Sequence, residues 1–97
     1  MSAEADFPAL HTCLAGYFHQ DWDLDDPTWE AVVDHFARDA PDLVPPARRD
    51  LARLLAAPDG DVERILFDEI MCAFYPPGDG LSIREWLIRL DERLAAA

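Results

Sequence analysis

The chain has 97 residues, of which 51% are hydrophobic and 10% aromatic, and its formal net charge is −12. A chain of this length buries roughly 65% of the surface that it exposes when unfolded, so one modest core is expected. The apolar content argues against global disorder. Because binding phosphates requires a basic patch, twenty acidic residues against eight basic ones argue against a nucleic-acid-binding protein and favour a basic partner.

The acidic residues are distributed unevenly along the chain. Residues 1–44 hold ten acidic residues and one arginine, which gives a charge of −9. Residues 45–97 hold ten acidic residues and seven arginines, which gives −3. A concentration of acidic residues can form a binding surface, or it can simply keep the protein soluble. The asymmetry favours a partner that binds the first half of the chain.

Apolar residues that recur every three or four positions predict an amphipathic helix near the start of the chain. The residues of this stripe are Phe7, Leu10, Leu14 and Tyr17. Helical order is expected to fail between about Gln20 and Asp26, because aspartate side chains compete for backbone amides. A second helix is predicted to begin with Asp26 as its cap and Pro27 in its first turn, and to end near Pro41.

Three further helices are predicted in the second half of the chain. The third is expected to be short and to follow a proline-bearing connection. The fourth, from about Asp61 to Tyr75, has a broad apolar stripe that is typical of a central, buried helix. The fifth begins at Ser82, which is followed three residues later by Glu85, the spacing of a capping box.

The sequence therefore predicts a compact all-α bundle of four to five helices, because no segment alternates apolar and polar residues over the length of a strand. Residues 1–97 are interpreted as a single domain with frayed ends at about 1–5 and 95–97. We find no amino-terminal signal sequence and no apolar run close to the roughly 20 residues that span a bilayer. This favours a cytoplasmic protein without a membrane partner, while its oligomeric state stays open.

Candidate sites for chemistry are weak. Residues 21–25 alternate aspartates as a calcium loop does, but Asp26 and Val32 stand where the loop needs a glycine and a bidentate glutamate. The three histidines form no recognisable pairing with a nucleophile or a metal ligand. Cys13 and Cys72 lack metal-ligand spacing and are expected to be buried, reduced thiols. No cofactor or metal site is predicted, and the chain is not expected to be an enzyme.

Residues 7–22 read FPALHTCLAGYFHQDW, and this stretch resembles the opening signature of bacterial immunity proteins from contact-dependent growth inhibition systems, the CdiI family. The YFHQDW core, Tyr17 to Trp22, is the most specific part. The resemblance implies a small all-helical protein that binds and neutralises the carboxyl-terminal domain of its cognate toxin, often a basic nuclease. An acidic surface would cover the cationic active site of such a nuclease by electrostatic and steric occlusion.

The candidate contact residues are carboxylates around the acidic link and the second helix. They are Asp21, Asp23, Asp25, Asp26, Glu30 and Asp34. The signature aromatics Tyr17, Phe18 and Trp22 are apolar enough to have a purely structural role, and Asp26 is also the predicted helix cap. The same charge allows an alternative function, a general acidic interaction module or nucleic-acid mimic that regulates a basic DNA-binding protein.

Overall fold

Helices provide all the regular secondary structure in the part of the chain that the computed structural model describes, residues 6–18, 28–70 and 72–97. The α-helices in these ranges are α2 (Pro8–His11), α4 (Trp29–Asp39), α5 (Val44–Leu55), α6 (Asp59–Glu63) and α7 (Ile83–Ala96). Shorter π- or 3₁₀-helical segments are η1 (Thr12–Tyr17), η2 (Pro41–Leu43), η3 (Arg64–Glu69) and η4 (Pro76–Asp79). The predicted all-α class is confirmed.

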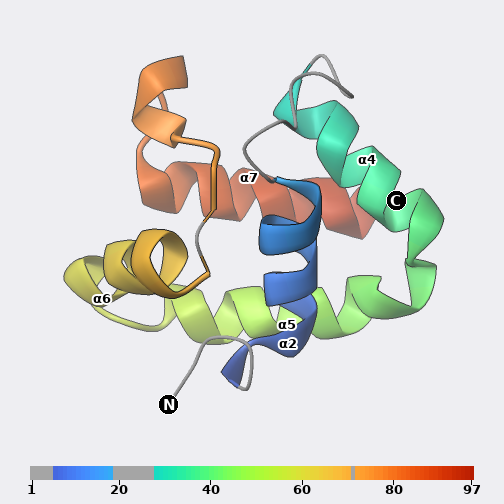
Figure 1. The fold of residues 1–97 in the computed structure, drawn as a ribbon, viewed down its shortest axis with the longest axis horizontal. Helices are drawn as coiled ribbons and strands as arrows, with labels where there is room; N and C mark the ends of the chain where they lie inside the picture. Colours follow the sequence, from blue (N-terminus) through green and yellow to red (C-terminus); the bar gives the residue numbers. More distant parts are fainter. Residues whose placement is uncertain (1–5, 19–27, 71) are drawn as a thin grey trace.

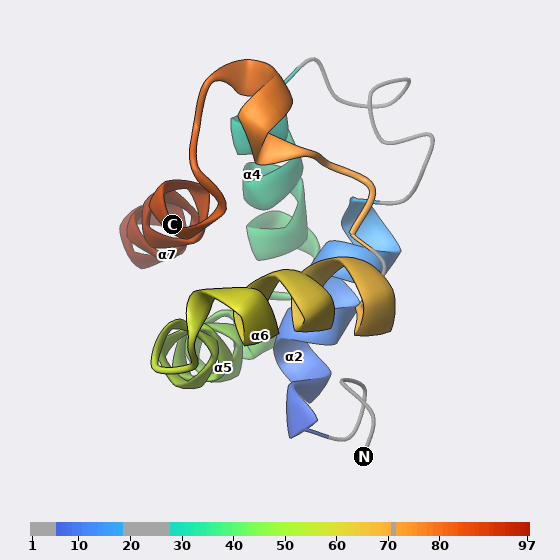
Figure 2. The same cartoon turned by 90° about the vertical axis from the view of Figure 1, so that its left-hand side faces the viewer.

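The helices surround a central amino-terminal segment (Figure 1). Helix α2 packs against α5, and η1, which continues α2 as a π-helix, packs against α4. Helix α7 packs against both α4 and α5, so it joins the two halves of the bundle (Figure 2). Among the described residues, no helix combines the length and the apolar character needed to cross a membrane.

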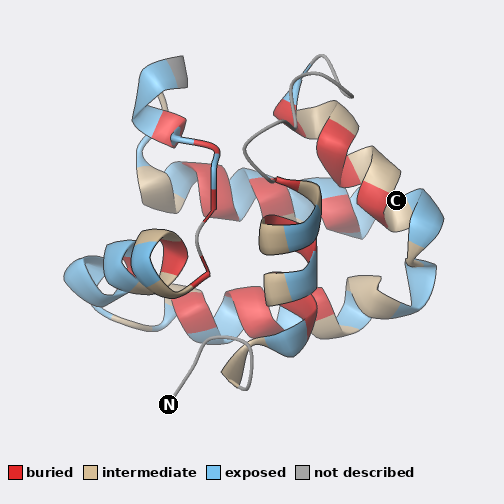
Figure 3. Ribbon diagram, viewed as in Figure 1, coloured by how far each residue is buried: buried red, intermediate tan, exposed pale blue. Residues whose placement is uncertain are grey.

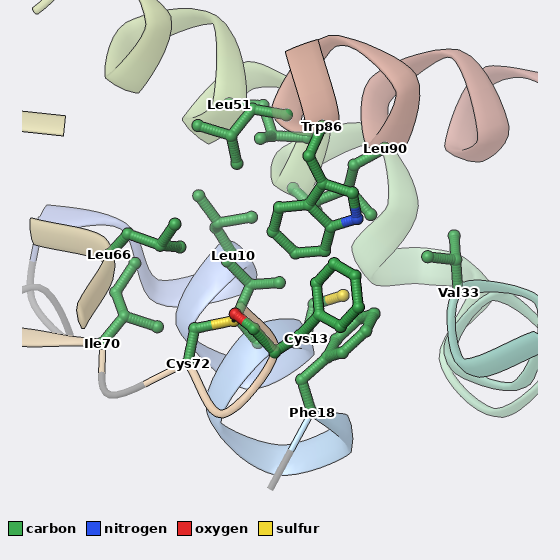
Figure 4. Close-up of a cluster of buried hydrophobic side chains, with 14 of the residues drawn as sticks. Leu10, Cys13, Phe18, Val33, Leu51, Leu66, Ile70, Cys72, Trp86 and Leu90 are labelled. Atoms are coloured by element: carbon green, nitrogen blue, oxygen red, sulfur yellow. The ribbon is translucent and has the colours of Figure 1, made fainter. Parts of the chain in front are cut away.

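The core is centred on Trp86 of α7, whose side chain is completely buried. Its ring lies 5.5 Å from that of Phe18 and 5.0 Å from that of Phe74, measured between ring centroids (Figure 4). Buried positions line the inner sides of α4, α5 and α7 around this aromatic cluster (Figure 3). Offset and edge-to-face aromatic contacts add to the stability that area burial alone provides.

A buried carboxylate fastens the amino-terminal helix to α5. Asp50 accepts hydrogen bonds from the backbone amides of Ala9 and Leu10, each at 3.1 Å, and so caps α2 from a distant element. Arg53 lies one turn further along α5 and donates to Asp50 at 2.9 Å. The guanidinium of Arg53 also lies 4.8 Å from the centroid of the Phe7 ring.

The second and third helices begin at residues other than those predicted. Thr28 is the cap of α4, because its hydroxyl accepts a hydrogen bond from the amide of Ala31 at 3.2 Å. The prediction that Asp26 caps this helix is therefore wrong, and Asp26 itself lies outside the described residues. The third helix is also not short: α5 has 12 residues, because Pro45 and Pro46 lie in its first turn, where a missing amide hydrogen costs nothing.

The predicted fourth helix ends early. Helix α6 and its π-helical continuation η3 stop at Glu69, six residues before the predicted end at Tyr75. Residues 72–75 lie outside any helix, with Cys72 and Phe74 buried and Ala73 and Tyr75 exposed. Side chains that alternate between buried and exposed are typical of an extended segment. Such a segment can bury its apolar residues against the core without being helical.

The last helix begins as predicted. The Ser82 hydroxyl accepts a hydrogen bond from the Glu85 amide at 3.0 Å, and the Glu85 carboxylate accepts one from the Ser82 amide at 3.2 Å. This reciprocal capping box satisfies two amides that the first turn leaves free. Helix α7 continues to Ala96, into the range 95–97 that the sequence predicts to be frayed.

Candidate interaction surface

Two of the six predicted contact residues, Glu30 and Asp34, lie in the described part of the chain, and both are on α4. The predictions for the other four concern residues outside the described ranges: Asp21, Asp23, Asp25 and Asp26. The same holds for Trp22. The described part of the predicted acidic surface is therefore the part on α4.

Asp34 forms an ion pair with α7. Its two carboxylate oxygens accept hydrogen bonds from Arg93, from Nε at 3.0 Å and from Nη2 at 2.7 Å. These hydrogen bonds lower the pKa of Asp34, against an opposing effect of partial burial, and they raise the pKa of Arg93. Asp34 is thus ionised and already paired in the free protein.

Glu30 lies one turn before Asp34 and faces a hollow between α4 and α7. This hollow has a volume of about 570 Å³ and is lined by Trp29, Glu30, Arg89, Glu92, Arg93 and Ala96. A smaller hollow of about 250 Å³, lined by Asp34, Arg93, Ala96 and Ala97, shares two of these residues. We call the two together the α4–α7 groove. Within the described ranges, Glu30, Glu92 and Arg89 form no ion pair, and Arg93 is paired with Asp34, so the groove has two unpaired negative charges and one unpaired positive charge.

The described signature residues have structural roles. Phe18 is completely buried in the aromatic core. The Tyr17 hydroxyl donates to Asp39 at 3.3 Å, and the Tyr17 ring makes edge contacts with His35 and Phe36, each at a centroid distance of 5.3 Å. These contacts hold η1 against α4, so the start of the YFHQDW core positions the helix that carries Glu30 and Asp34. This packing supports a structural role for Tyr17 and Phe18, which the sequence leaves open.

The cysteines are poorly suited to nucleophilic chemistry. Both are free and buried, as predicted. Burial raises the pKa of the Cys72 thiol to about 12, and it raises the pKa of Cys13 as well. At neutral pH both thiols are therefore protonated. In the described ranges, no group of three or more histidine, cysteine, aspartate or glutamate side chains is placed to hold a metal ion.

Sequence reasoning missed the α7 side of the groove. Arg93 is 59 residues away from Asp34 in the chain, so no local spacing connects the two. Glu92 likewise belongs to the last helix, for which the sequence predicts only a capping box at its start. The packing of α4 against α7 brings these residues together in the folded protein.

Comparisons with known proteins agree on family and fold. Residues 6–94 match a family model described as CdiI immunity protein. A chain in the crystal structure of the CdiA-CT/CdiI complex from Y. kristensenii 33638 superposes with a TM-score of 0.83 and is 24% identical in sequence. The match covers 92% of this chain and 98% of that chain. No curated protein sequence matches the chain at a significant level.

Proposed function

Because the chain belongs to the CdiI immunity protein family, we propose that it binds the carboxyl-terminal toxin domain of its cognate CdiA protein and neutralises that domain. The observation that carries this proposal is the family match over residues 6–94. The fold shared with a chain of a CdiA-CT/CdiI complex supports it. Immunity proteins act by binding and not by turnover, so the chain is not an enzyme. We place its action in the cytoplasm, where it would meet the delivered toxin domain.

The proposed mechanism is electrostatic and steric occlusion of a basic nuclease. The net charge of −12 is complementary to the cationic surface that binds a nucleic-acid backbone. Complementary potentials raise association rates to as much as about 10⁸ to 10⁹ per molar per second, which favours capture before the toxin reaches its substrate. A protein bound over the active site then excludes the nucleic acid by volume as well as by charge.

The α4–α7 groove supplies part of the proposed contact surface. Glu30 is the better candidate for a direct contact, because its carboxylate forms no ion pair with a described residue. Asp34 would have to share or break its two hydrogen bonds with Arg93 before it bound a toxin side chain. Asp21, Asp23, Asp25 and Asp26 stay proposed contacts on the strength of charge alone.

The test of the function uses the toxin domain that is encoded beside this gene. Co-expression of the chain should restore growth to cells that produce this domain, and the two purified proteins should form a stoichiometric complex by size-exclusion chromatography. A toxin domain from an unrelated system serves as control and should be neither bound nor neutralised. Absence of both rescue and binding would refute the proposal. Competition with DNA for several basic proteins would favour a nucleic-acid mimic instead.

The contact surface is tested with a triple variant, Asp23→Asn, Asp25→Asn and Glu30→Gln. We expect slower toxin association at low salt with unchanged helical content, because steering depends on exposed charge. A control variant, Asp42→Asn and Asp68→Asn, removes two charges from exposed positions that form no ion pair with a described residue and lie outside both proposed contact surfaces. Equal slowing per removed charge in the two variants would show that only total charge matters.

A further inference from the structure

A second hollow lies at the other end of α7 from the α4–α7 groove. It has a volume of about 430 Å³ and is lined by Asp59, Val62, Glu63, Pro77, Ser82, Ile83 and Arg84. We call it the α6–α7 recess. Its residues come from α6, η4 and the start of α7, three segments that lie on the side of the molecule facing the viewer in Figure 2. The function proposed above makes no use of this hollow.

Arg84, the positively charged residue of the recess, uses all three of its guanidinium nitrogens in hydrogen bonds. Arg84 donates from Nε to Asp59 at 2.8 Å, from Nη1 to the Leu55 carbonyl at 2.6 Å, and from Nη2 to the Ala57 carbonyl at 3.0 Å. Each of its three nitrogens therefore has a partner, and its charge is balanced by Asp59. The recess is thus unsuited to an anionic group.

Glu63 provides the free charge of the recess. It is exposed on α6 and, within the described part of the chain, forms no ion pair. The lining beside it is apolar, with the half-buried Ile83 over the buried Val62. A carboxylate beside an apolar floor suits a side chain that combines an aliphatic stem with a cationic head, which is the structure of lysine and arginine.

Tyr75, an exposed aromatic residue, lies close to the recess residue Pro77 in the chain and contacts the half-buried Phe67. Tyr75 is 61% exposed, and its ring lies 5.8 Å from that of Phe67. Phe67 comes four residues after Glu63, and Tyr75 comes two residues before Pro77, so the two rings follow or precede lining residues of the recess in the chain. Large exposed aromatic side chains are enriched among the residues that dominate binding energy at protein interfaces.

We propose that the α6–α7 recess is an anchor point for the toxin domain and accepts one lysine or arginine side chain from it. The aliphatic stem lies along Ile83, the cationic head pairs with Glu63, and Tyr75 packs against the neighbouring toxin surface. This inference rests on the proposed function, because it takes the toxin domain as the partner. It adds a specific contact to the broad electrostatic attraction of the acidic surface.

The recess and the α4–α7 groove lie near opposite ends of α7. Helix α7 has 14 residues, and at a rise of 1.5 Å per residue its two ends are about 20 Å apart. An interface of ordinary size covers about 800 Å² of each partner. This is a small part of the 5367 Å² that the protein exposes. The anchor therefore does not require that the toxin domain also contacts the α4–α7 groove.

The inference is tested with Glu63→Gln and Tyr75→Ala, whose affinities for the purified toxin domain are compared with that of the wild type by biolayer interferometry. We expect each substitution to raise the dissociation constant about tenfold or more, mainly through faster dissociation. Asp42→Asn is the matched control, since Asp42 is an exposed carboxylate on η2, without an ion pair to any described residue. The Asp42→Asn substitution removes one negative charge, as Glu63→Gln does, and it should change the dissociation constant less than about twofold.

The outcomes separate the two proposals. If the wild type binds the toxin domain but Glu63→Gln behaves like Asp42→Asn, the anchor is refuted and the immunity function stands. If the wild type does not bind, the proposed function fails and the anchor fails with it. Circular dichroism and thermal unfolding of each variant show whether its fold is intact. The more conservative Tyr75→Phe should retain most of the affinity if Tyr75 contributes through its ring, whereas a loss equal to that of Tyr75→Ala would contradict the packing role.

Discussion

Arg93 on α7 donates two hydrogen bonds to Asp34 on α4, at 3.0 Å and 2.7 Å. The two residues are 59 positions apart in the chain, so this pair joins two helices that are distant in the sequence. The pair lies beside Glu30, whose carboxylate forms no ion pair with a described residue. An acidic residue that the sequence predicts to be a contact is therefore also part of the framework that holds the groove together. Substitution of Asp34 consequently affects stability as well as surface charge.

The Asp34–Arg93 pair makes stability depend on acidic pH. Hydrogen bonding from Arg93 lowers the pKa of Asp34 below its ordinary value of 3.8, so the pair stabilises the fold above that pH and loses its effect as the pH falls through the folded-state pKa. The thermal midpoint of Asp34→Asn should lie below that of the wild type at pH 7, and the gap should close below about pH 4. Solvent screening keeps the gap small, because both side chains are partly exposed.

Differential scanning calorimetry between pH 7 and pH 2.5 measures this gap. Asp42→Asn removes the same charge from an exposed position and corrects for the general effect of net charge. A gap that stays constant down to the lowest pH would show that Asp34 does not stabilise the fold through its ionised form.

Local sequence signals predicted those helix boundaries that depend on neighbouring residues. The spacing of Ser82 and Glu85 is sufficient to form a capping box, and the structure contains it. The start of α4 was misplaced because Asp26, Pro27 and Thr28 all suit the beginning of a helix, and the local pattern does not choose among them. The structure uses Thr28.

Features that depend on long-range packing could not be predicted in this way. A stretch of apolar residues such as Ile70 to Phe74 can be buried either as a helix or as an extended segment. The structure uses the extended form after η3, where the Ala73 amide donates to the Phe18 carbonyl at 3.1 Å. The same limit applies to the interaction surface, because the partner of Asp34 and the lining of the α6–α7 recess come from helices that are distant in the sequence.

Asp50→Ala should destabilise the protein strongly although it removes a charged residue from an acidic chain. It leaves the buried amides of Ala9 and Leu10 without their acceptor, which should cost about 2 to 4 kcal/mol. Urea unfolding followed by circular dichroism measures this loss. Asp68→Ala changes an exposed carboxylate and should stay within about 0.5 kcal/mol of the wild type. Similar stabilities of the two variants would contradict the capping role of Asp50.

The two cysteines should react with thiol reagents only when the protein unfolds. Burial raises the pKa of Cys72 to about 12 and also raises that of Cys13, so at pH 8 the reactive thiolate is scarce as well as inaccessible. Labelling with iodoacetamide, followed by mass spectrometry, should show almost no product in buffer and two modified sites in guanidinium chloride. Fast labelling of native protein at either cysteine would show that the core opens locally near it.

Phe36→Ala should weaken the protection of cells while leaving the affinity of the folded protein for the toxin domain nearly unchanged. Phe36 is completely buried on α4, and its truncation leaves a cavity that costs about 3 to 5 kcal/mol, a large share of the stability of a domain of this size. We expect urea unfolding to show this loss, and cells at 37 °C to be poorly protected because less folded protein is present. At 10 °C, where circular dichroism can verify that the variant is folded, its affinity for the toxin domain should stay within about threefold of the wild type. A folded variant with greatly reduced affinity would instead show that the packing of Phe36 sets the position of the α4 contact residues.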